Sequence, residues 1–94
     1  MLEVYFGIDK SSIMWTLQNN KLTRTFVFPD FDTTFSFMAE VAGLSKEMNH
    51  HPRWTNVYNK VEMELSTHDA NNTVTQKDYK LAEGIDLIWK RYQL

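Results

Sequence analysis

A change of hydrophobic period in the second half of the chain restricts the fold more than any other feature. Between Trp54 and Thr67 apolar and polar residues alternate, which is typical of a half-buried sheet because successive side chains of a strand point to opposite faces. We expect two strands with a turn near Asn59. One face carries Val57, Val61, Met63 and Leu65, and the other carries Tyr58, Lys60, Glu62, Glu64 and Ser66.

The last part of the chain has the period of an amphipathic helix. Its apolar residues recur at spacings of three and four, and they are Leu81, Ala82, Ile85, Ile88, Trp89 and Tyr92. We expect this helix to start near Thr75, because Thr75 and Asp78 resemble a capping box with aspartate in place of glutamate.

The first half has a similar arrangement of two strands and a helix. Residues 14–28 contain two β-rich runs around Asn19 and Asn20, and asparagine tolerates the left-handed conformations of tight hairpin turns. Pro29 ends the second strand. A hairpin is therefore predicted here.

A helix follows this hairpin. Asp30 or Asp32 can cap it, and its broad apolar side continues to about Met48. The complete order of elements predicts an α+β fold, a four-stranded antiparallel sheet with helices packed on one face. Residues 1–12 receive no assignment.

Length, charge and composition exclude several classes of protein. A chain of 94 residues is expected to form a single domain, residues 1–94. Its net charge of −2 provides no basic field, so direct nucleic-acid binding is not expected. The absence of cysteine excludes disulfides, thiolate metal sites and cysteine nucleophiles. Without a cationic start or a run of 18 apolar residues, we expect a cytoplasmic protein with no membrane contact.

The three histidines are the first candidates for a functional site. His50 and His51 are adjacent and are followed by Pro52, which would fix the approach to the next strand. Antiparallel pairing between Trp54 and Thr67 would bring His68 back towards His51. All three imidazoles could then share one end of the sheet. The alternative is that His50 and His51 only favour the negative end of the preceding helix dipole.

Acid-base chemistry suits these histidines better than metal binding. Neighbouring residues of an extended chain point to opposite sides, so His50 and His51 do not readily bind one ion. The helical pattern of histidines four apart is also missing. Imidazole can both donate and accept a proton near neutral pH.

Asp78 and two aromatic residues allow both structural and functional interpretations. Asp78 precedes Leu81 and Ala82 by three and four residues and therefore faces inward. It either satisfies free amides at the start of the helix or takes part in the site. Trp54 and Tyr58 either belong to the core or form a wall against a flat ligand.

The segments "HHPRWTNVYNKVEMELSTHD" and "VTQKDYKLAEGID" closely resemble the pterin-4a-carbinolamine dehydratases. The resemblance extends from around Trp15 to about Asp86. It implies that His50, His51 and His68 line a pterin pocket, and we expect these three residues to be catalytic. Substrate binding is expected from His51, Pro52, Trp54 and Asp78, without a metal or an organic cofactor.

The resemblance also implies an activity and partners. The expected reaction is dehydration of 4a-hydroxytetrahydrobiopterin, a pterin-4a-carbinolamine, to quinonoid dihydropterin in tetrahydropterin recycling. An alternative is a non-catalytic module that binds a pterin or acts as a dimerisation cofactor. A homodimer or homotetramer is expected.

The chain departs from many of these relatives at three places. Only about a dozen residues precede "IMW", where relatives often have an initial helix. The segment after His68 reads "DANNTVTQ" where relatives have glycines. Lys46 and then Glu47 stand where relatives often place a glutamate four residues before the first histidine, so the charge of the pocket can differ.

Overall fold

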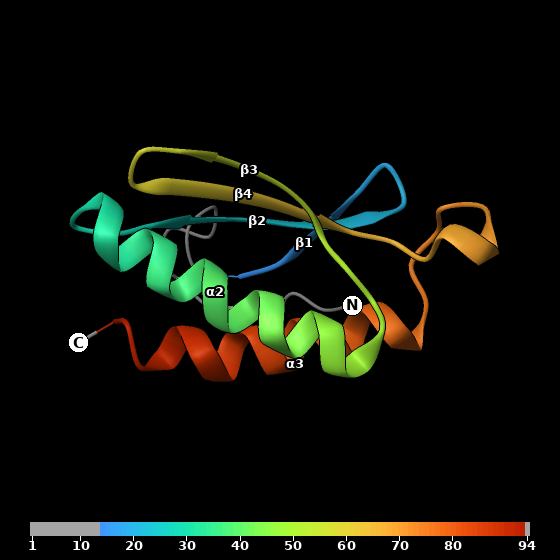
Figure 1. The fold of residues 1–94 in the computed structure, drawn as a ribbon. Coiled ribbons are helices and arrows are strands. Elements are labelled where there is room, and N and C mark those ends of the chain that lie inside the picture. Colours follow the sequence, from blue (N-terminus) through green and yellow to red (C-terminus); the bar gives the residue numbers. More distant parts are fainter. Residues whose placement is uncertain (1–13, 94) are drawn as a thin grey trace.

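The computed structural model describes residues 14–93 as one layer of strands covered by two long helices on the same face (Figure 1). Along the chain the elements are β1 (Thr16–Gln18), β2 (Lys21–Val27), α2 (Phe31–Met48), β3 (Arg53–Val57), β4 (Lys60–Leu65), the 3₁₀ turn η1 (His68–Ala70) and α3 (Gln76–Lys90). The strands pair antiparallel in the order β1-β2-β4-β3. The predicted α+β fold is confirmed. Residues 1–12, for which no element was predicted, lie outside the described residues.

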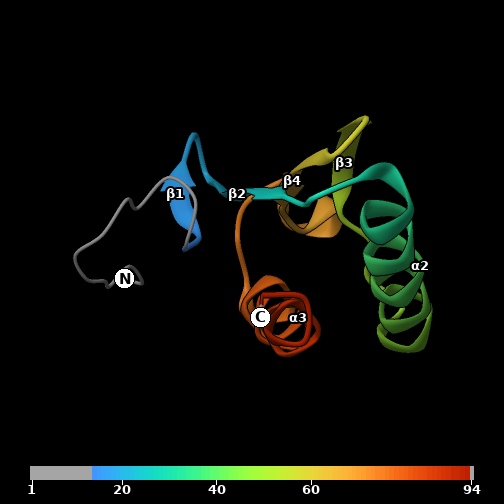
Figure 2. The same cartoon turned by 90° about the vertical axis from the view of Figure 1, so that its left-hand side faces the viewer.

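The two helices cover different parts of the sheet. Viewed from the end, α2 lies towards the edge strand β3, whereas α3 lies nearer the middle strands (Figure 2). Gly84 of α3 marks their close approach, because a Cβ there would lie 2.6 Å from Leu44 Cδ2 of α2. Aromatic rings pack between the sheet and the two helices. The ring centroids of Phe26 and Phe37 are 4.9 Å apart, and those of Phe26 and Trp89 are 5.1 Å apart.

Turn geometry explains one confirmed prediction and one error. Asn19 and Asn20 both have positive φ, at 51° and 61°, as the predicted hairpin requires. The second hairpin turns at Tyr58 and Asn59, so Val57 pairs with Lys60. Cross-strand partners share a face. Val57 therefore lies with Lys60 on the outer face, 64% exposed, and its predicted place beside Val61 was wrong.

The helix ends follow their local sequences. Asp30 is the N-cap of α2, and its Oδ1 accepts a hydrogen bond from Thr33 N at 2.8 Å. Hydrogen bonding from the Thr33 side chain, and then from its backbone N–H, lowers the pKa of Asp30 below its usual value of 3.8. The helix ends where Asn49 takes a left-handed conformation, with φ of 53°. Thr75 caps α3 and forms the predicted capping box with Asp78.

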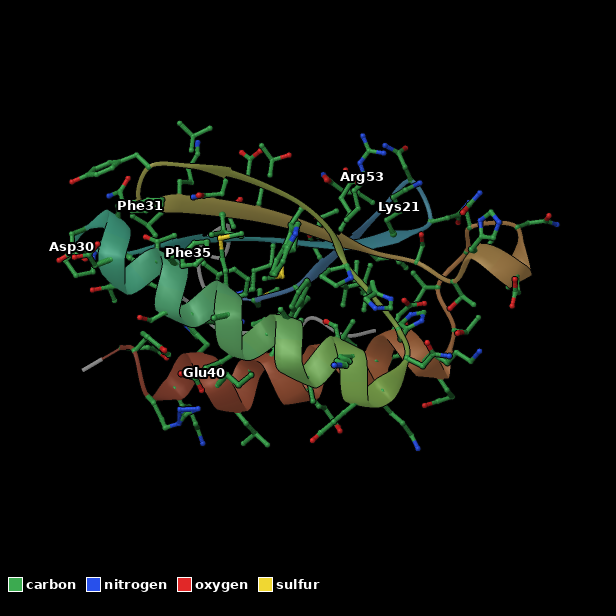
Figure 3. The ribbon with its side chains drawn as sticks, in the orientation of Figure 1. Lys21, Asp30, Phe31, Phe35, Glu40 and Arg53 are labelled. Atoms are coloured by element: carbon green, nitrogen blue, oxygen red, sulfur yellow. The ribbon has the colours of Figure 1, made fainter. Side chains whose placement is uncertain are left out.

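Charged side chains lie on the uncovered face of the sheet and also between the two helices. Arg53 and Lys21 belong to the face of the sheet that the helices leave uncovered, whereas Glu40 extends from α2 towards α3 (Figure 3). There the Glu40 carboxylate accepts hydrogen bonds from Arg91 and from the Tyr92 hydroxyl. These contacts join the middle of α2 to the end of α3.

Candidate active site

The pairing of β3 with β4 brings the three histidines to one pocket. Arg53 at the start of β3 pairs with Glu64 near the end of β4, so the residues just before β3 lie beside those just after β4. A pocket of about 350 Å³ opens at this end of the sheet. It is lined by Asn49, His50, His51, Ser66, Thr67, His68, Asp69 and Lys77. The three imidazoles thus share one end of the sheet, as the strand pairing predicts.

The end of α2 gives the two adjacent histidines different environments. After the left-handed Asn49, the backbone N–H of His50 donates to Ser45 O at 3.1 Å and completes the helix end. The His50 side chain is only 12% exposed, whereas His51 is exposed. The two adjacent rings therefore reach the pocket from different positions.

Asp78 lies fully buried beneath His50 and outside the pocket lining. Its Oδ1 is 2.7 Å from His50 Nε2. Its Oδ2 accepts hydrogen bonds from Thr67 Oγ1 at 2.7 Å and from Thr75 N at 2.9 Å. The predicted inward orientation of Asp78 is confirmed. An ionised carboxylate only accepts hydrogen bonds, so with Asp78 ionised the Nε2 of His50 is the donor.

The other predicted binding residues lie apart from the pocket lining. Trp54 on β3 is partly buried and packs against the hydrophobic core, and Pro52 is also partly buried. Tyr58 is in the exposed turn between β3 and β4. Substrate contacts by Pro52, Trp54 and Asp78 remain predictions.

Several lining residues have no strong signal in the sequence. Asp69 and Lys77 reach the pocket from η1 and from the first turn of α3. Thr67 lies two residues after Leu65 and is likewise buried. Its contact with Asp78 depends on how the strand and the helix meet in space.

Three imidazoles are among the side chains of this pocket that can act as acids or bases. Within residues 14–93 no group of three or more His, Cys, Asp or Glu side chains is placed to hold a metal ion. A larger hollow of about 530 Å³ is formed mainly by residues of β1, β2 and β4, and no histidine lines it. Of these two hollows, the smaller one contains all three histidines. No helix in the described part of the chain could cross a membrane.

Comparison with known proteins gives a consistent result. A family model described as "Pterin 4 alpha carbinolamine dehydratase" matches residues 7–88. A protein of Prochlorococcus marinus (strain MIT 9303) is 49% identical over 74 residues, which is 79% of this chain and 76% of that protein. One from Burkholderia pseudomallei (strain 1710b) is 52% identical over 69 residues, 73% of this chain and 67% of that protein. Both carry the name "Putative pterin-4-alpha-carbinolamine dehydratase".

Two solved structures have a similar fold. The transcriptional coactivator/pterin dehydratase from Brucella melitensis matches with a TM-score of 0.75 and 39% identity, over 82% of this chain and 83% of that one. A pterin dehydratase-like protein identified as a RuBisCO assembly factor in the alpha-carboxysome has a TM-score of 0.69 over 80% of this chain and 88% of that one. At 22% identity, the second likeness concerns the fold alone.

Proposed function

The chain belongs to the pterin-4a-carbinolamine dehydratase family, and from this membership we propose that it dehydrates 4a-hydroxytetrahydropterins. In this reaction the C4a–O bond breaks, the hydroxyl group leaves as water with an added proton, and N5 loses its proton. A double bond forms between N5 and C4a, which gives the quinonoid dihydropterin. The reaction needs one acid and one base.

The observation that carries this proposal is the grouping of His50, His51 and His68 around one pocket. We assign the two proton transfers to His50 and His68, which reach the pocket from different elements. His51 is assigned mainly to substrate binding. Each such transfer typically contributes about 10²- to 10⁴-fold to the rate.

Asp78 has a positioning role in this scheme. Its 2.7 Å hydrogen bond holds the His50 ring and assigns Nε2 as the donor to the carboxylate. His50 Nδ1 then remains to exchange a proton with the substrate. Pro52 and Trp54 are proposed to support substrate binding from the start of β3.

The wider setting of the activity is also a proposal. Recycling of tetrahydrobiopterin would place the enzyme in the cytoplasm, which agrees with a chain without cysteine. We propose a homodimer or homotetramer. The net charge of −2 supports the absence of direct nucleic-acid binding.

A second candidate is a protein-interaction module. The Brucella relative is described as a transcriptional coactivator as well as a pterin dehydratase. On this chain Phe31 and Phe35 of α2 stack with centroids 5.9 Å apart, yet they are 44% and 56% exposed. Exposed aromatic side chains are enriched at protein interfaces.

A direct dehydration assay tests the enzymatic proposal. Freshly generated 4a-hydroxytetrahydrobiopterin is followed spectroscopically with and without the protein, because the substrate also loses water unaided. We expect a rate above this background in proportion to protein concentration. A folded protein that leaves the rate at background would contradict the proposal. Pterin binding measured by fluorescence then separates a pterin-binding module from one that needs no ligand.

A further inference from the structure

Two threonine hydroxyls lie directly behind the contact between His50 and Asp78. Thr67, the second residue after β4, and Thr75, the N-cap of α3, have their Oγ1 atoms 2.6 Å apart. Thr67 Oγ1 also donates to Asp78 Oδ2 at 2.7 Å. Both hydroxyls are thus connected to the carboxylate that holds His50.

The hydrogen bonds in this group have one consistent direction. Thr67 has a single hydroxyl hydrogen and gives it to Asp78, so its contact with Thr75 requires the Thr75 hydroxyl to donate to Thr67. Thr75 Oγ1 in turn accepts from Lys77 N at 3.3 Å. The chain of donors runs from the first turn of α3 through both threonines to Oδ2, and each bond polarises the next.

We propose that the Thr67–Thr75 hydroxyl pair is a positioning device that orients Asp78 and thereby keeps His50 in one tautomer. With Oδ2 held by Thr67 and by Thr75 N, Oδ1 alone remains for His50 Nε2. The part of the chain that the structure describes offers no hydrogen-bond partner to His50 Nδ1. Nδ1 is therefore the nitrogen available to a ligand.

This role of Thr67 exceeds ordinary helix capping. A capping box needs only the N-cap and N3 residues, here Thr75 and Asp78. Thr67 is a third member that arrives from the end of the sheet, and it is itself buried. Its backbone N–H donates to Thr73 O at 2.8 Å, and its carbonyl accepts from Ala70 N, which fixes the turn that carries the next residue, His68. One residue thus positions both proposed proton-transfer groups.

The test compares Thr67→Val with Thr67→Ser in the full chain. Valine keeps the shape of the threonine side chain and removes the hydroxyl, whereas serine keeps the hydroxyl. Thr73→Val is the matched control, since the Thr73 hydroxyl bonds to Ala70 O in the same turn and does not contact Asp78. The main readout is the ¹H–¹⁵N NMR signal of His50 Nε2–H, which is expected downfield and slowly exchanging in the wild type.

We expect this signal in the wild type, Thr67→Ser and Thr73→Val, and its loss or exchange broadening in Thr67→Val. The catalytic consequence rests on the proposed function. There kcat is expected to fall about tenfold to a hundredfold in Thr67→Val with little change in KM, as for the loss of one hydrogen bond to a charged group. If Thr67→Val does not fold, Thr75→Val breaks the same chain of donors one step earlier.

A wild-type protein without the protected Nε2–H signal would overturn the inference, as would a folded valine variant that keeps the signal unchanged. The NMR result does not depend on turnover. A protein with the expected signals but no dehydration above background would refute the proposed function while supporting the positioning role.

Discussion

His50 and Asp78 are 28 positions apart in the sequence, and a 2.7 Å hydrogen bond joins His50 Nε2 to Asp78 Oδ1. The bond connects the end of α2 with the first turn of α3 at the edge of the pocket. Because Asp78 is fully buried, its carboxylate must be satisfied by these neighbours rather than by water. The helix cap and the candidate active site therefore share one side chain.

Asp78→Asn is expected to impair both stability and turnover. If the amide oxygen faces His50, the NH₂ group faces the donors Thr67 Oγ1 and Thr75 N; if the amide flips, the NH₂ group faces His50 Nε2. The first orientation loses hydrogen bonds, and the second forces His50 into the Nδ1–H tautomer, so we expect about 1–3 kcal/mol of destabilisation together with lower turnover. Urea unfolding measures this cost. The control Asp69→Asn changes an exposed carboxylate of the pocket rim and should be nearly neutral for stability.

His50→Ala and His68→Ala are each expected to lower kcat by about 10²- to 10⁴-fold, the range typical of one proton transfer. His51→Ala should mainly raise KM, because a contact made equally in the ground state and the transition state affects binding. Steady-state kinetics above the uncatalysed rate, at several pH values, measures both constants. Wild-type turnover by folded His50→Ala and His68→Ala would refute the assigned chemistry.

Local sequence was sufficient for most of the fold. The changes of period and the capping residues predicted the helices and the four strands, and Asp78 faces inward as its helical spacing requires. Val57 was misplaced because the number of residues in the turn decides which residues of β3 and β4 share a face. Alternation alone does not contain that number.

The candidate site was only partly visible in the sequence. The approach of His68 to His51 follows from strand pairing, because β3 and β4 are consecutive strands joined by a short turn. By contrast, the contact of His50 with Asp78 depends on how α3 packs against the end of the sheet. A threonine such as Thr67 has no local signature of its role, since its partners come from a distant helix.

Metal chelators are expected to leave dehydration unchanged, because His50 and His51 are adjacent and poorly arranged to share an ion. Activity is measured before and after dialysis against a chelator, together with metal analysis of the purified protein. Stoichiometric zinc or iron that is lost together with activity would overturn the acid-base assignment.

A homodimer or homotetramer is expected in solution. The edge strand β3 has one side without a partner strand among residues 14–93, and Phe31 and Phe35 are exposed on the neighbouring helix α2. Light scattering at micromolar concentration measures the mass. An 11.1 kDa particle at every concentration tested would show that the chain is monomeric.

Tyr92→Phe is expected to remove part of the loss of stability at alkaline pH. Burial and the hydrogen bond to Glu40 raise the pKa of Tyr92 above its usual value of 10.0, because both disfavour the phenolate. The unfolded chain then releases this proton at lower pH than the folded protein does. The stabilising contribution of the neutral phenol is complete below pH 10 and is lost as the pH rises through the folded pKa.

The difference in unfolding free energy between wild type and Tyr92→Phe should therefore be constant near neutral pH and decrease above about pH 10. Urea unfolding over this range measures it, and the difference between the absorbance titrations of the two proteins isolates the Tyr92 phenolate. Glu40→Gln removes the negative charge beside the hydroxyl and should bring the Tyr92 pKa closer to 10.0. A free-energy difference that stays constant through the alkaline range would show that the contact between α2 and Tyr92 does not hold the phenol in its neutral form.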